Sequence, residues 1–212
     1  MMFITLEGID GCGKTTQARL LHKELSSHLS PRLVVLVRDP GGTTIGDRIR
    51  AILLDPAHMK MAVAAEVLLY FASRAQLVEE IIRPAIGNGD LVISDRYFDA
   101  TLAYQGYGRG VEVGMLEELQ RFSTRGLMPD LTFLLDIDPD IGRARIAGGR
   151  PHDGQSGGDR MERQGADFAR QVRDGYLVAA KAHPDRIRVL DAARPPEAIL
   201  RDMRMELDSR GL

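Results

Sequence analysis

The feature that most constrains this chain is a glycine-rich run close to its start, from Gly8 to Thr15. Two glycines separated by four residues are followed by Lys14 and Thr15, with an apolar stretch (3–6) before the run and an amphipathic stretch (15–29) after it. Glycines permit backbone torsions that turn successive N–H groups inward, and a helix N-terminus adds partial positive charge. The pattern therefore predicts a phosphate-binding P-loop between a first strand and a first helix.

The polar residues of this loop have expected parts in holding a nucleoside triphosphate. Lys14 would bring positive charge to the β- and γ-phosphates, and the Thr15 hydroxyl would bind Mg²⁺. ATPases, GTPase switches and small-molecule kinases share the motif, so it predicts a triphosphate but no particular reaction. The residues expected to surround the triphosphate are Gly8, Ile9, Asp10, Gly11, Cys12, Gly13, Lys14, Thr15 and Thr16.

Short apolar runs alternate with longer amphipathic stretches along the chain. Strands that read as continuous apolar runs, separated by helices, favour a parallel sheet covered on both faces. We expect an α/β fold of the P-loop nucleoside triphosphate hydrolase class, as one domain spanning 1–212. The expected strands are 3–6, 33–37, 91–94, 131–137 and 187–190, and the expected helices are 15–29, 45–54, 62–86, 113–124, 165–183 and 196–207.

The composition excludes several classes of protein. A formal charge of −2 gives no general attraction to nucleic acid or to an anionic membrane. The single cysteine, Cys12, rules out an intramolecular disulfide and multi-cysteine zinc sites, and is consistent with a reducing cytoplasm. No apolar run approaches the roughly 20 residues that a membrane-spanning helix needs. We expect a cytoplasmic protein that binds neither membrane nor nucleic acid.

Charged residues follow two of the expected strands. Asp95 and Arg96 come directly after the strand 91–94, where side chains of a parallel sheet face the ligand crevice. Asp95 could hold Mg²⁺ directly or through water, and Arg96 could grip phosphate oxygens with its guanidinium. The alternative is a surface salt bridge between neighbours, which would contribute little. A second group, Arg38 to Thr43 with Arg48 and Arg50, follows the strand 33–37.

Phe71 and Arg74 form a third candidate pair. They lie three residues apart and so share one face of the expected helix. A ring and a guanidinium side by side could stack on a base and bond its carbonyl edge. Periodicity alone favours the other interpretation, in which Phe71 belongs to the core and Arg74 is a solvated charge.

One segment, 147–158, breaks the alternation of strands and helices because it is rich in glycine and polar residues. A long irregular loop inside a compact domain is usually either functional or disordered. We expect a mobile lid covering about 147–164.

Taken together, these motifs resemble bacterial thymidylate kinases from end to end. Any one of them except the P-loop would be a weak signal, but their number and order are specific. The resemblance rests on Leu6–Gly11 leading into the P-loop, Arg38–Thr43, Phe71–Arg74, Asp95–Tyr97, Thr101–Gly106, Pro129–Asp130 and Val189–Ala192.

The resemblance implies ATP-dependent, Mg²⁺-assisted phosphorylation of dTMP to dTDP. It places dTMP against Asp10, Asp39, Pro40, Arg50, Phe71, Arg74, Arg96, Thr101, Tyr104 and Gln105. In this assignment Phe71 stacks on thymine, Arg74 bonds its O4, and Thr101 contacts the base edge. Tyr104 lies where a ribose 2′-OH would clash, and Asp10 reaches the 3′-OH. Arg50 and Arg96 hold the acceptor phosphate, Thr15 and Asp95 serve Mg²⁺, and Arg145, Asp191 and Ala192 surround the adenine.

Two positions distinguish this chain within the family. Some members carry an arginine directly after the P-loop aspartate, where this chain has Gly11; in members of this kind the lid supplies the catalytic arginine. One lid arginine, Arg150 or Arg160, is therefore expected to be catalytic beside Lys14, Asp95 and Arg96. The longer, glycine-rich lid leaves His152 and Arg163 open as alternatives. The usual Arg-Glu-Pro is replaced by Arg38, Asp39 and Pro40, with an acid one methylene shorter. The family also implies a homodimer.

Three rival interpretations remain at the level of sequence. The nearest is another nucleotide kinase, for uridylate or a deoxynucleoside, because one methyl group distinguishes thymine from uracil. A GTPase switch is a second possibility, since Asp39 to Gly42 fits a loose Asp-x-x-Gly pattern, but no Asn-Lys-x-Asp motif occurs. The balanced charge argues against a nucleic-acid module.

Overall fold

A computed structural model describes residues 2–28, 33–148 and 158–212. Within them, five parallel strands form one sheet in the order β2-β3-β1-β4-β5. The strands are β1 (Phe3–Glu7), β2 (Val34–Arg38), β3 (Leu91–Asp95), β4 (Leu131–Asp136) and β5 (Ile187–Asp191). The expected α/β class and parallel sheet are confirmed, and each strand lies within one residue of its expected position.

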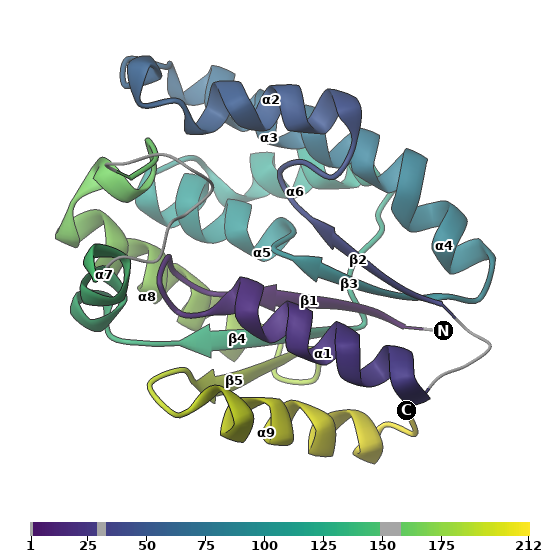
Figure 1. Cartoon of the computed structure of the whole chain (residues 1–212). Coiled ribbons are helices and arrows are strands. Elements are labelled where there is room, and N and C mark those ends of the chain that lie inside the picture. Colours follow the sequence, from purple (N-terminus) through teal and green to yellow (C-terminus); the bar gives the residue numbers. More distant parts are fainter. Residues whose placement is uncertain (1, 29–32, 149–157) are drawn as a thin grey trace.

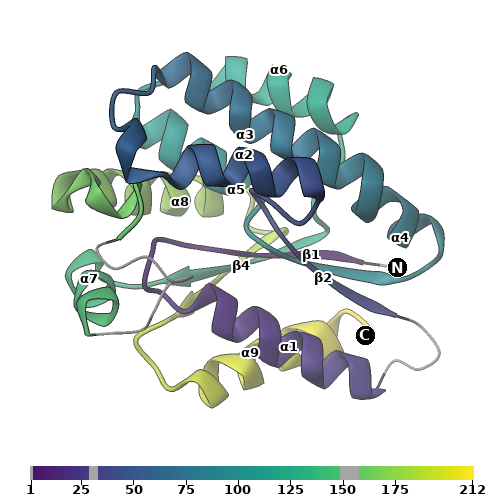
Figure 2. The same cartoon turned by 45° about the horizontal axis from the view of Figure 1, so that its top comes forward.

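Helices pack on both faces of this sheet (Figures 1 and 2). One face carries α1 (Lys14–His28) and α9 (Pro196–Ser209). The other carries α3 (Val63–Leu77), the short α5 (Phe98–Thr101) and α8 (Ala166–Ala182), with α2 (Thr44–Leu54) and α6 (Val113–Thr124) packed on α3. The remaining helical segments are Pro56–His58, Val78–Ile82, α4 (Arg83–Gly87), Leu102–Gly108, α7 (Pro139–Ala147) and Glu162–Gln164.

Local sequence sets several of these helix ends. The Thr43 side chain accepts the Gly46 N–H at 2.9 Å and so caps α2. Glu112 caps α6 by accepting the N–H groups of Gly114 and Met115. Such caps satisfy donors that the first turn of a helix leaves without partners. The expected bounds of α2 and α6 agree with those observed to within one residue.

The register brings the carboxyl ends of the strands to one edge of the sheet. Leu6 of β1 is opposite both Asp95 of β3 and Phe133 of β4, and Arg38 of β2 is also opposite Asp95. Ligands of open parallel sheets bind in the crevice outside these ends, where the strand order changes direction. The charged residues that follow β1, β2 and β3 therefore meet in one place.

Two features of the helices were not expected from the sequence. The stretch 62–86 is not one regular helix, because a π-helical segment (Val78–Ile82) separates α3 from α4. A second π-helical segment (Leu102–Gly108) continues α5, where no helix was expected. Among the described helices, none combines the length and the hydropathy that a membrane-spanning segment requires.

Candidate active site

The P-loop has the backbone that its glycines were expected to provide. Gly8, Gly11 and Gly13 have φ angles of 137°, 80° and 96°, in a region that favours glycine. Helix α1 begins directly after the loop, at Lys14, so its N-terminal N–H groups face the same place. The Lys14 ammonium donates to the Ile9 carbonyl at 2.7 Å and is nearly buried. The positive charge of Lys14 is thus fixed against the P-loop by a protein contact.

The position of Gly11 leaves no room for a side chain. A Cβ atom there would lie 2.2 Å from the carbonyl oxygen of Gly142 in α7. The backbone of α7 therefore packs directly on the P-loop. An arginine at this position would require α7 to move, which supports the expectation that any catalytic arginine comes from elsewhere in the chain.

Thr15 and Asp95, the two expected Mg²⁺ ligands, lie in contact. The Thr15 hydroxyl donates to Asp95 Oδ2 at 2.6 Å. The other oxygen, Asp95 Oδ1, is buried, lies 3.7 Å from the Arg96 guanidinium, and has no hydrogen-bond partner among the described residues. A hydroxyl and a carboxylate are hard oxygen donors of the kind that Mg²⁺ prefers. The pair fits this ion, with one carboxylate oxygen still to be satisfied.

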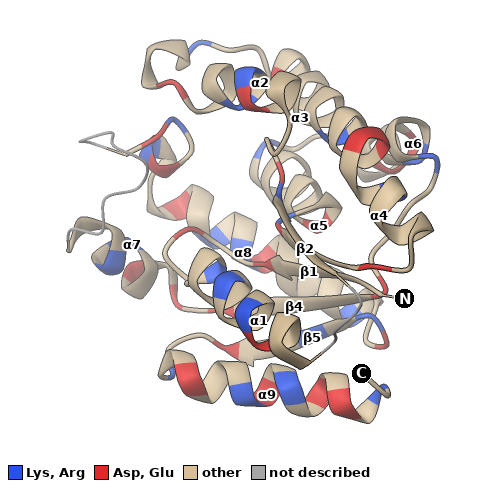
Figure 3. Ribbon diagram, turned by 45° about the vertical axis from the view of Figure 1, so that its right-hand side comes forward, with Lys and Arg blue, Asp and Glu red and all other residues tan. Residues whose placement is uncertain are grey.

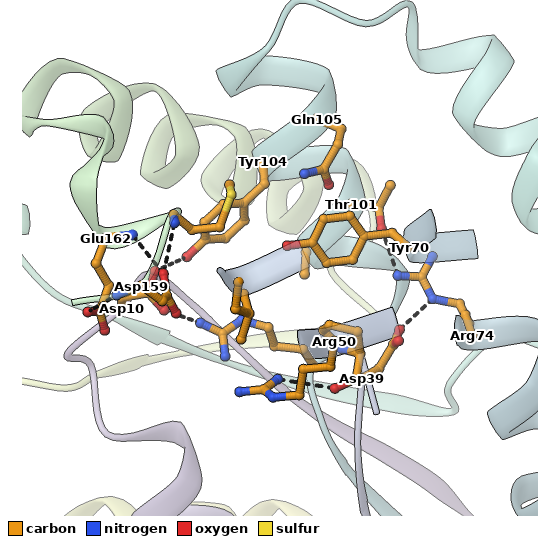
Figure 4. A pocket seen from close by; sticks show the side chains of 15 residues that line it. Asp10, Asp39, Arg50, Tyr70, Arg74, Thr101, Tyr104, Gln105, Asp159 and Glu162 are labelled. Carbon is orange, nitrogen blue, oxygen red and sulfur yellow. Dashed lines mark hydrogen bonds and ion pairs between the residues drawn. The ribbon is translucent and has the colours of Figure 1, made fainter. Parts of the chain in front are cut away.

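A cavity lies beside the P-loop at the carboxyl ends of β1, β2 and β3. Figure 4 shows its side chains, which come from the P-loop, the ends of β2 and β3, α2, α3, the α5 region and the segment after 158. The cavity is lined by Asp10, Asp39, Pro40, Arg50, Leu54, Tyr70, Arg74, Arg96, Ala100, Thr101, Tyr104, Gln105, Asp159, Met161 and Glu162. All the residues expected to contact dTMP are among them except Phe71.

Arg74 is the most constrained cation of this pocket. Its side chain is 1% exposed, and its Nε donates to Asp39 Oδ2 at 2.5 Å. Further N–H groups donate to Thr101 Oγ1 (2.7 Å), the Tyr97 carbonyl (3.2 Å) and Gln120 Oε1 (3.2 Å). The periodicity argument, which made Arg74 a solvated surface charge, is wrong. The guanidinium is instead held rigidly in the pocket wall.

Asp39 stands where the resemblance led us to expect a glutamate, and its side-chain oxygen Oδ2 accepts the hydrogen bond from Arg74. Its second oxygen, Oδ1, is buried and has no hydrogen-bond partner in the described part of the chain. Burial raises the pKa of Asp39, and the neighbouring Arg74 charge opposes that rise. The carboxylate therefore fixes Arg74 and leaves one acceptor atom in the pocket wall.

Phe71, the ring that the resemblance assigned to thymine, lies in the core, as the periodicity argument alone favoured. Phe71 is 3% exposed, and its ring packs 6.4 Å from Phe98 in the core with the Arg74 guanidinium 5.1 Å away. It does not line the cavity, whereas Tyr70 does (Figure 4). The pocket-facing aromatic ring of α3 is therefore that of Tyr70, one residue earlier than the ring assigned to thymine.

Asp10 joins the P-loop to this pocket. It forms an ion pair with Arg96, and its Oδ2 accepts the Tyr104 hydroxyl at 3.0 Å. Burial and the Asp10 charge raise the pKa of Tyr104, so its hydroxyl stays protonated as a donor. These three residues, expected at the sugar and the acceptor phosphate, lie together.

The residues expected around adenine also lie together, with Arg145 on α7 and with Asp191 and Ala192 at the end of β5. The Arg145 guanidinium donates to the carbonyls of Ala192 (2.9 Å) and Ala193 (3.5 Å). Asp191 accepts the Ala193 N–H at 2.9 Å and so shapes the turn that Arg145 contacts. The guanidinium plane of Arg145 and this turn could form two sides of a site for a flat ring.

Of the two arginines expected in the lid, the structure describes Arg160 and not Arg150. Arg150 lies outside the described residues. Arg160 is 1% exposed, and its guanidinium contacts Glu66 Oε2 at 2.5 Å and the Leu53 carbonyl at 2.6 Å. This guanidinium is not among the groups that line the cavity. Arg160 here anchors the segment after 158 to α2 and α3, and its catalytic role stays a prediction.

Glu66 is the acceptor on which this anchor depends, and the sequence analysis did not identify it. Its buried carboxylate accepts hydrogen bonds from Arg160, from Gln105 at 2.8 Å and from Arg109 at 3.3 Å. It therefore joins α3 to the π-helical segment after α5 and to the segment that carries Asp159 and Met161. Only its position on the buried side of an amphipathic helix could have marked it.

Glu7 is a second buried acid that the sequence analysis missed, at the last position of β1. Oε1 accepts the N–H groups of Tyr97 (2.7 Å) and Ala100 (3.3 Å), and Oε2 accepts the Tyr176 hydroxyl at 2.9 Å. Burial, reinforced by the Asp99 charge, raises the pKa of Glu7 from 4.5 to about 8.

The raised pKa of Glu7 predicts how stability changes with pH. Between pH 4.5 and about 8 the folded protein binds more protons than the unfolded chain, so the Glu7 contribution to the free energy of unfolding falls as pH rises. Glu7→Gln cannot ionise. We expect its stability relative to the parent protein to increase steadily from pH 5 to pH 8, measured by urea unfolding. A difference that stays constant over this range would contradict the shift.

A family model described as thymidylate kinase matches residues 6–203. The thymidylate kinase of Pelotomaculum thermopropionicum is 47% identical over 201 residues, covering 95% of this chain and 90% of the relative. That of Deinococcus radiodurans is 44% identical over 211 residues, covering 99% and 98%. The crystal structure of the Ehrlichia chaffeensis thymidylate kinase superposes with a TM-score of 0.70 at 34% identity, covering 89% and 91%.

Proposed function

This chain belongs to the thymidylate kinase family, and from that premise we propose that its cavity holds dTMP while its P-loop holds ATP. The family reaction transfers the γ-phosphoryl group of ATP to dTMP, giving dTDP and ADP. The observation that carries the proposal is the position of Asp10, which belongs to the P-loop and also lines the cavity beside Arg96. The two substrates would therefore meet phosphate to phosphate at this residue.

The main task of such an enzyme is to bring two polyanions together. Two unit charges 4 Å apart repel by about 4 kcal/mol at an effective dielectric constant near 20. Lys14 on the ATP side and Arg96 and Arg50 on the acceptor side would offset that repulsion. The dTMP phosphate is already a nucleophile at neutral pH, so no strong general base is needed. The residues bind, orient and neutralise, as in other phosphoryl transfers.

Mg²⁺ is the cofactor proposed for the site. The Thr15 hydroxyl and the Asp95 carboxylate would hold it, and it would neutralise charge on the β- and γ-phosphates. The structure supports this through the contact between the two side chains and through the unsatisfied Asp95 Oδ1. Within the protein, the same Asp95 lies next to Arg96 and so links the metal side of the site to the acceptor side.

We propose that Tyr70, rather than Phe71, flanks the base of dTMP. Tyr70→Ala is expected to raise the KM for dTMP by about 10- to 100-fold, because base–aromatic stacking contributes about 1–3 kcal/mol. The KM for ATP should change little. Phe71→Leu serves as the matched control, since it alters a core ring that does not line the cavity. Steady-state kinetics in which Phe71→Leu raises the KM for dTMP more than Tyr70→Ala would restore the original assignment.

We propose that the site prefers dTMP to monophosphates with other bases. The experiment is a panel of dTMP, dUMP, UMP and dCMP with coupled detection of ADP. We expect dTMP to have the highest kcat/KM, with the loss of one methyl group lowering it by about 10- to 200-fold. A higher kcat/KM for UMP would support the rival uridylate kinase.

Acidic and basic residues are interspersed along α9 (Figure 3), which does not favour the nucleic-acid alternative.

We also propose a homodimer formed through α3 and α6. Leu68 of α3 and Phe122 of α6 are 57% and 86% exposed, although helices packed on a globular core usually present polar residues to solvent. A second copy of the chain would bury them. Leu68→Glu is expected to convert the dimer to a monomer in light scattering after gel filtration. A parent protein that elutes as a monomer at micromolar concentration would refute the proposal.

A further inference from the structure

Arg96 has an unusual backbone for a residue with a long side chain. Its φ angle is 72°, and Arg125 is the only other non-glycine residue with positive φ among those the structure describes. For L-residues this region brings Cβ close to the following carbonyl oxygen, so it is unfavourable unless surrounding contacts impose it. Such residues tend to occur at functional sites.

The peptide group between Arg96 and Tyr97 is held at both ends. Its carbonyl oxygen accepts the Ser94 hydroxyl at 2.6 Å, and its N–H donates to Glu7 Oε1 at 2.7 Å. Ser94 and Glu7 have no exposed surface and come from the neighbouring strands β3 and β1. The peptide before Arg96 is fixed as well, because the Arg96 N–H donates to the Leu6 carbonyl at 3.0 Å.

The direction of the Arg96 side chain depends on this backbone conformation. It leaves the end of β3, enters the cavity and pairs with Asp10 while its side chain remains 23% exposed. If the peptide after Arg96 rotated toward an ordinary extended conformation, the carbonyl would leave Ser94 and the N–H would leave Glu7. The Cα–Cβ direction of Arg96 would change with it, and the guanidinium would no longer have its place beside Asp10.

We propose that Ser94 and Glu7 are positioning residues that clamp the 96–97 peptide and thereby aim Arg96 at the acceptor phosphate. This rests on the proposed function, which places Arg96 on that phosphate. Glu7 adds a second constraint, because the same oxygen accepts the Ala100 N–H at 3.3 Å and so ties the turn to α5. Neither side chain lines the cavity, so both act through Arg96.

The first experiment compares two variants that each remove one buried hydroxyl. Ser94→Ala releases the Arg96 carbonyl and is expected to lower kcat/KM for dTMP by about 10-fold, the usual net effect of one hydrogen bond. The KM for ATP should change less than twofold. Thr5→Val is the matched control: Thr5 is equally buried, and its hydroxyl bonds only Thr132, at 2.8 Å, among the contacts described. Thr5→Val should retain the parent kcat/KM.

A double-variant cycle separates positioning from a general structural effect. Arg96→Met should lower kcat/KM for dTMP by at least about 100-fold. In that background Ser94→Ala should have no further effect, because the residue it positions is gone. An equal 10-fold fall in both backgrounds would overturn the clamp, as would a Ser94→Ala variant that behaves like Thr5→Val. Normal activity of Arg96→Met would instead contradict the role of Arg96 in the proposed function.

Glu7 gives an independent test of the same clamp. Glu7→Gln keeps a carbonyl oxygen that can accept the Tyr97 N–H, whereas Glu7→Met removes it while keeping a similar length. We expect Glu7→Met to lose about tenfold more kcat/KM for dTMP than Glu7→Gln. Equal losses in the two variants would show that acceptance of the Tyr97 N–H is not what matters, and the proposal for Glu7 would fail.

Discussion

Lys14→Ala is expected to lower kcat by at least about 10²- to 10³-fold, the range seen when one fixed donor to a transition-state charge is removed. The Lys14 ammonium is already held over the P-loop by the Ile9 carbonyl, so it needs little rearrangement to meet a phosphate. The fold should survive, because the substitution removes only the two hydrogen bonds from Lys14, to the Ile9 carbonyl and to Cys12 Sγ, and leaves no buried charge without a partner. Steady-state ADP formation with saturating dTMP and ATP measures the effect.

The matched control for this prediction is Lys23→Ala. Lys23 lies on the same helix, α1, but is exposed to solvent and distant from the loop. It should retain the parent kcat. Near-normal turnover by Lys14→Ala, with a circular dichroism spectrum like that of the parent, would contradict the assignment of the phosphate cradle.

Arg74→Ala has the second largest expected effect, and it acts on both binding and stability. Removing one partner of the buried pair leaves Asp39 without compensation, which typically destabilises a protein by about 3–5 kcal/mol. We expect the KM for dTMP to rise by about 10- to 100-fold, because Arg74 is proposed to donate a charged hydrogen bond to the base. The KM for ATP should change much less, since Arg74 lies on the acceptor side of the site.

The stability effect needs its own control, because a weakened fold could by itself reduce activity. Arg186→Ala also removes a buried partner, since Arg186 pairs with the fully buried Asp99 at 2.6 Å without lining the cavity. It should lower the urea midpoint but leave the KM for dTMP near the parent value. If Arg74→Ala raises the KM for ATP as much as that for dTMP, then Arg74 is structural.

The strands and the phosphate loop could be predicted from sequence because their signals are local. Apolar runs mark buried parallel strands, and the spacing from Gly8 to Thr15 fits one backbone arrangement. Asp95 and Arg96 could be placed at the crevice because a residue that follows a parallel strand has only one edge of the sheet to occupy. The family resemblance added the acceptor residues, and the cavity brings all of them together except Phe71.

The choice between Tyr70 and Phe71 could not be made from helical spacing. Arg74 lies three residues after Phe71 and four after Tyr70, so both rings share a face with it. Only the packing of α3 on α6 and the sheet decides which ring enters the core. The helical stretch after Phe98 was missed for a related reason, because its mixed polar and apolar residues face two buried surfaces and show no simple period.

The anchoring of Arg160 and the role of Glu7 depend on contacts between residues far apart in the chain. Arg160 meets Glu66 across 94 residues, and Glu7 meets Tyr97 across 90. Both are buried charged or ionisable groups with several partners, and the identity of those partners is decided by tertiary structure. Sequence could mark Arg160 only as one basic residue among several near an irregular segment.

The central claim is that one edge of the sheet holds ATP and dTMP phosphate to phosphate. The most direct test measures ADP formation from ATP and Mg²⁺ by the parent protein, with and without dTMP, while dTDP is followed by chromatography. We expect slow ADP formation without dTMP, a large stimulation by dTMP, and one dTDP for each ADP. ADP formation that is unaffected by dTMP, or stimulated without dTDP appearing, would contradict the account.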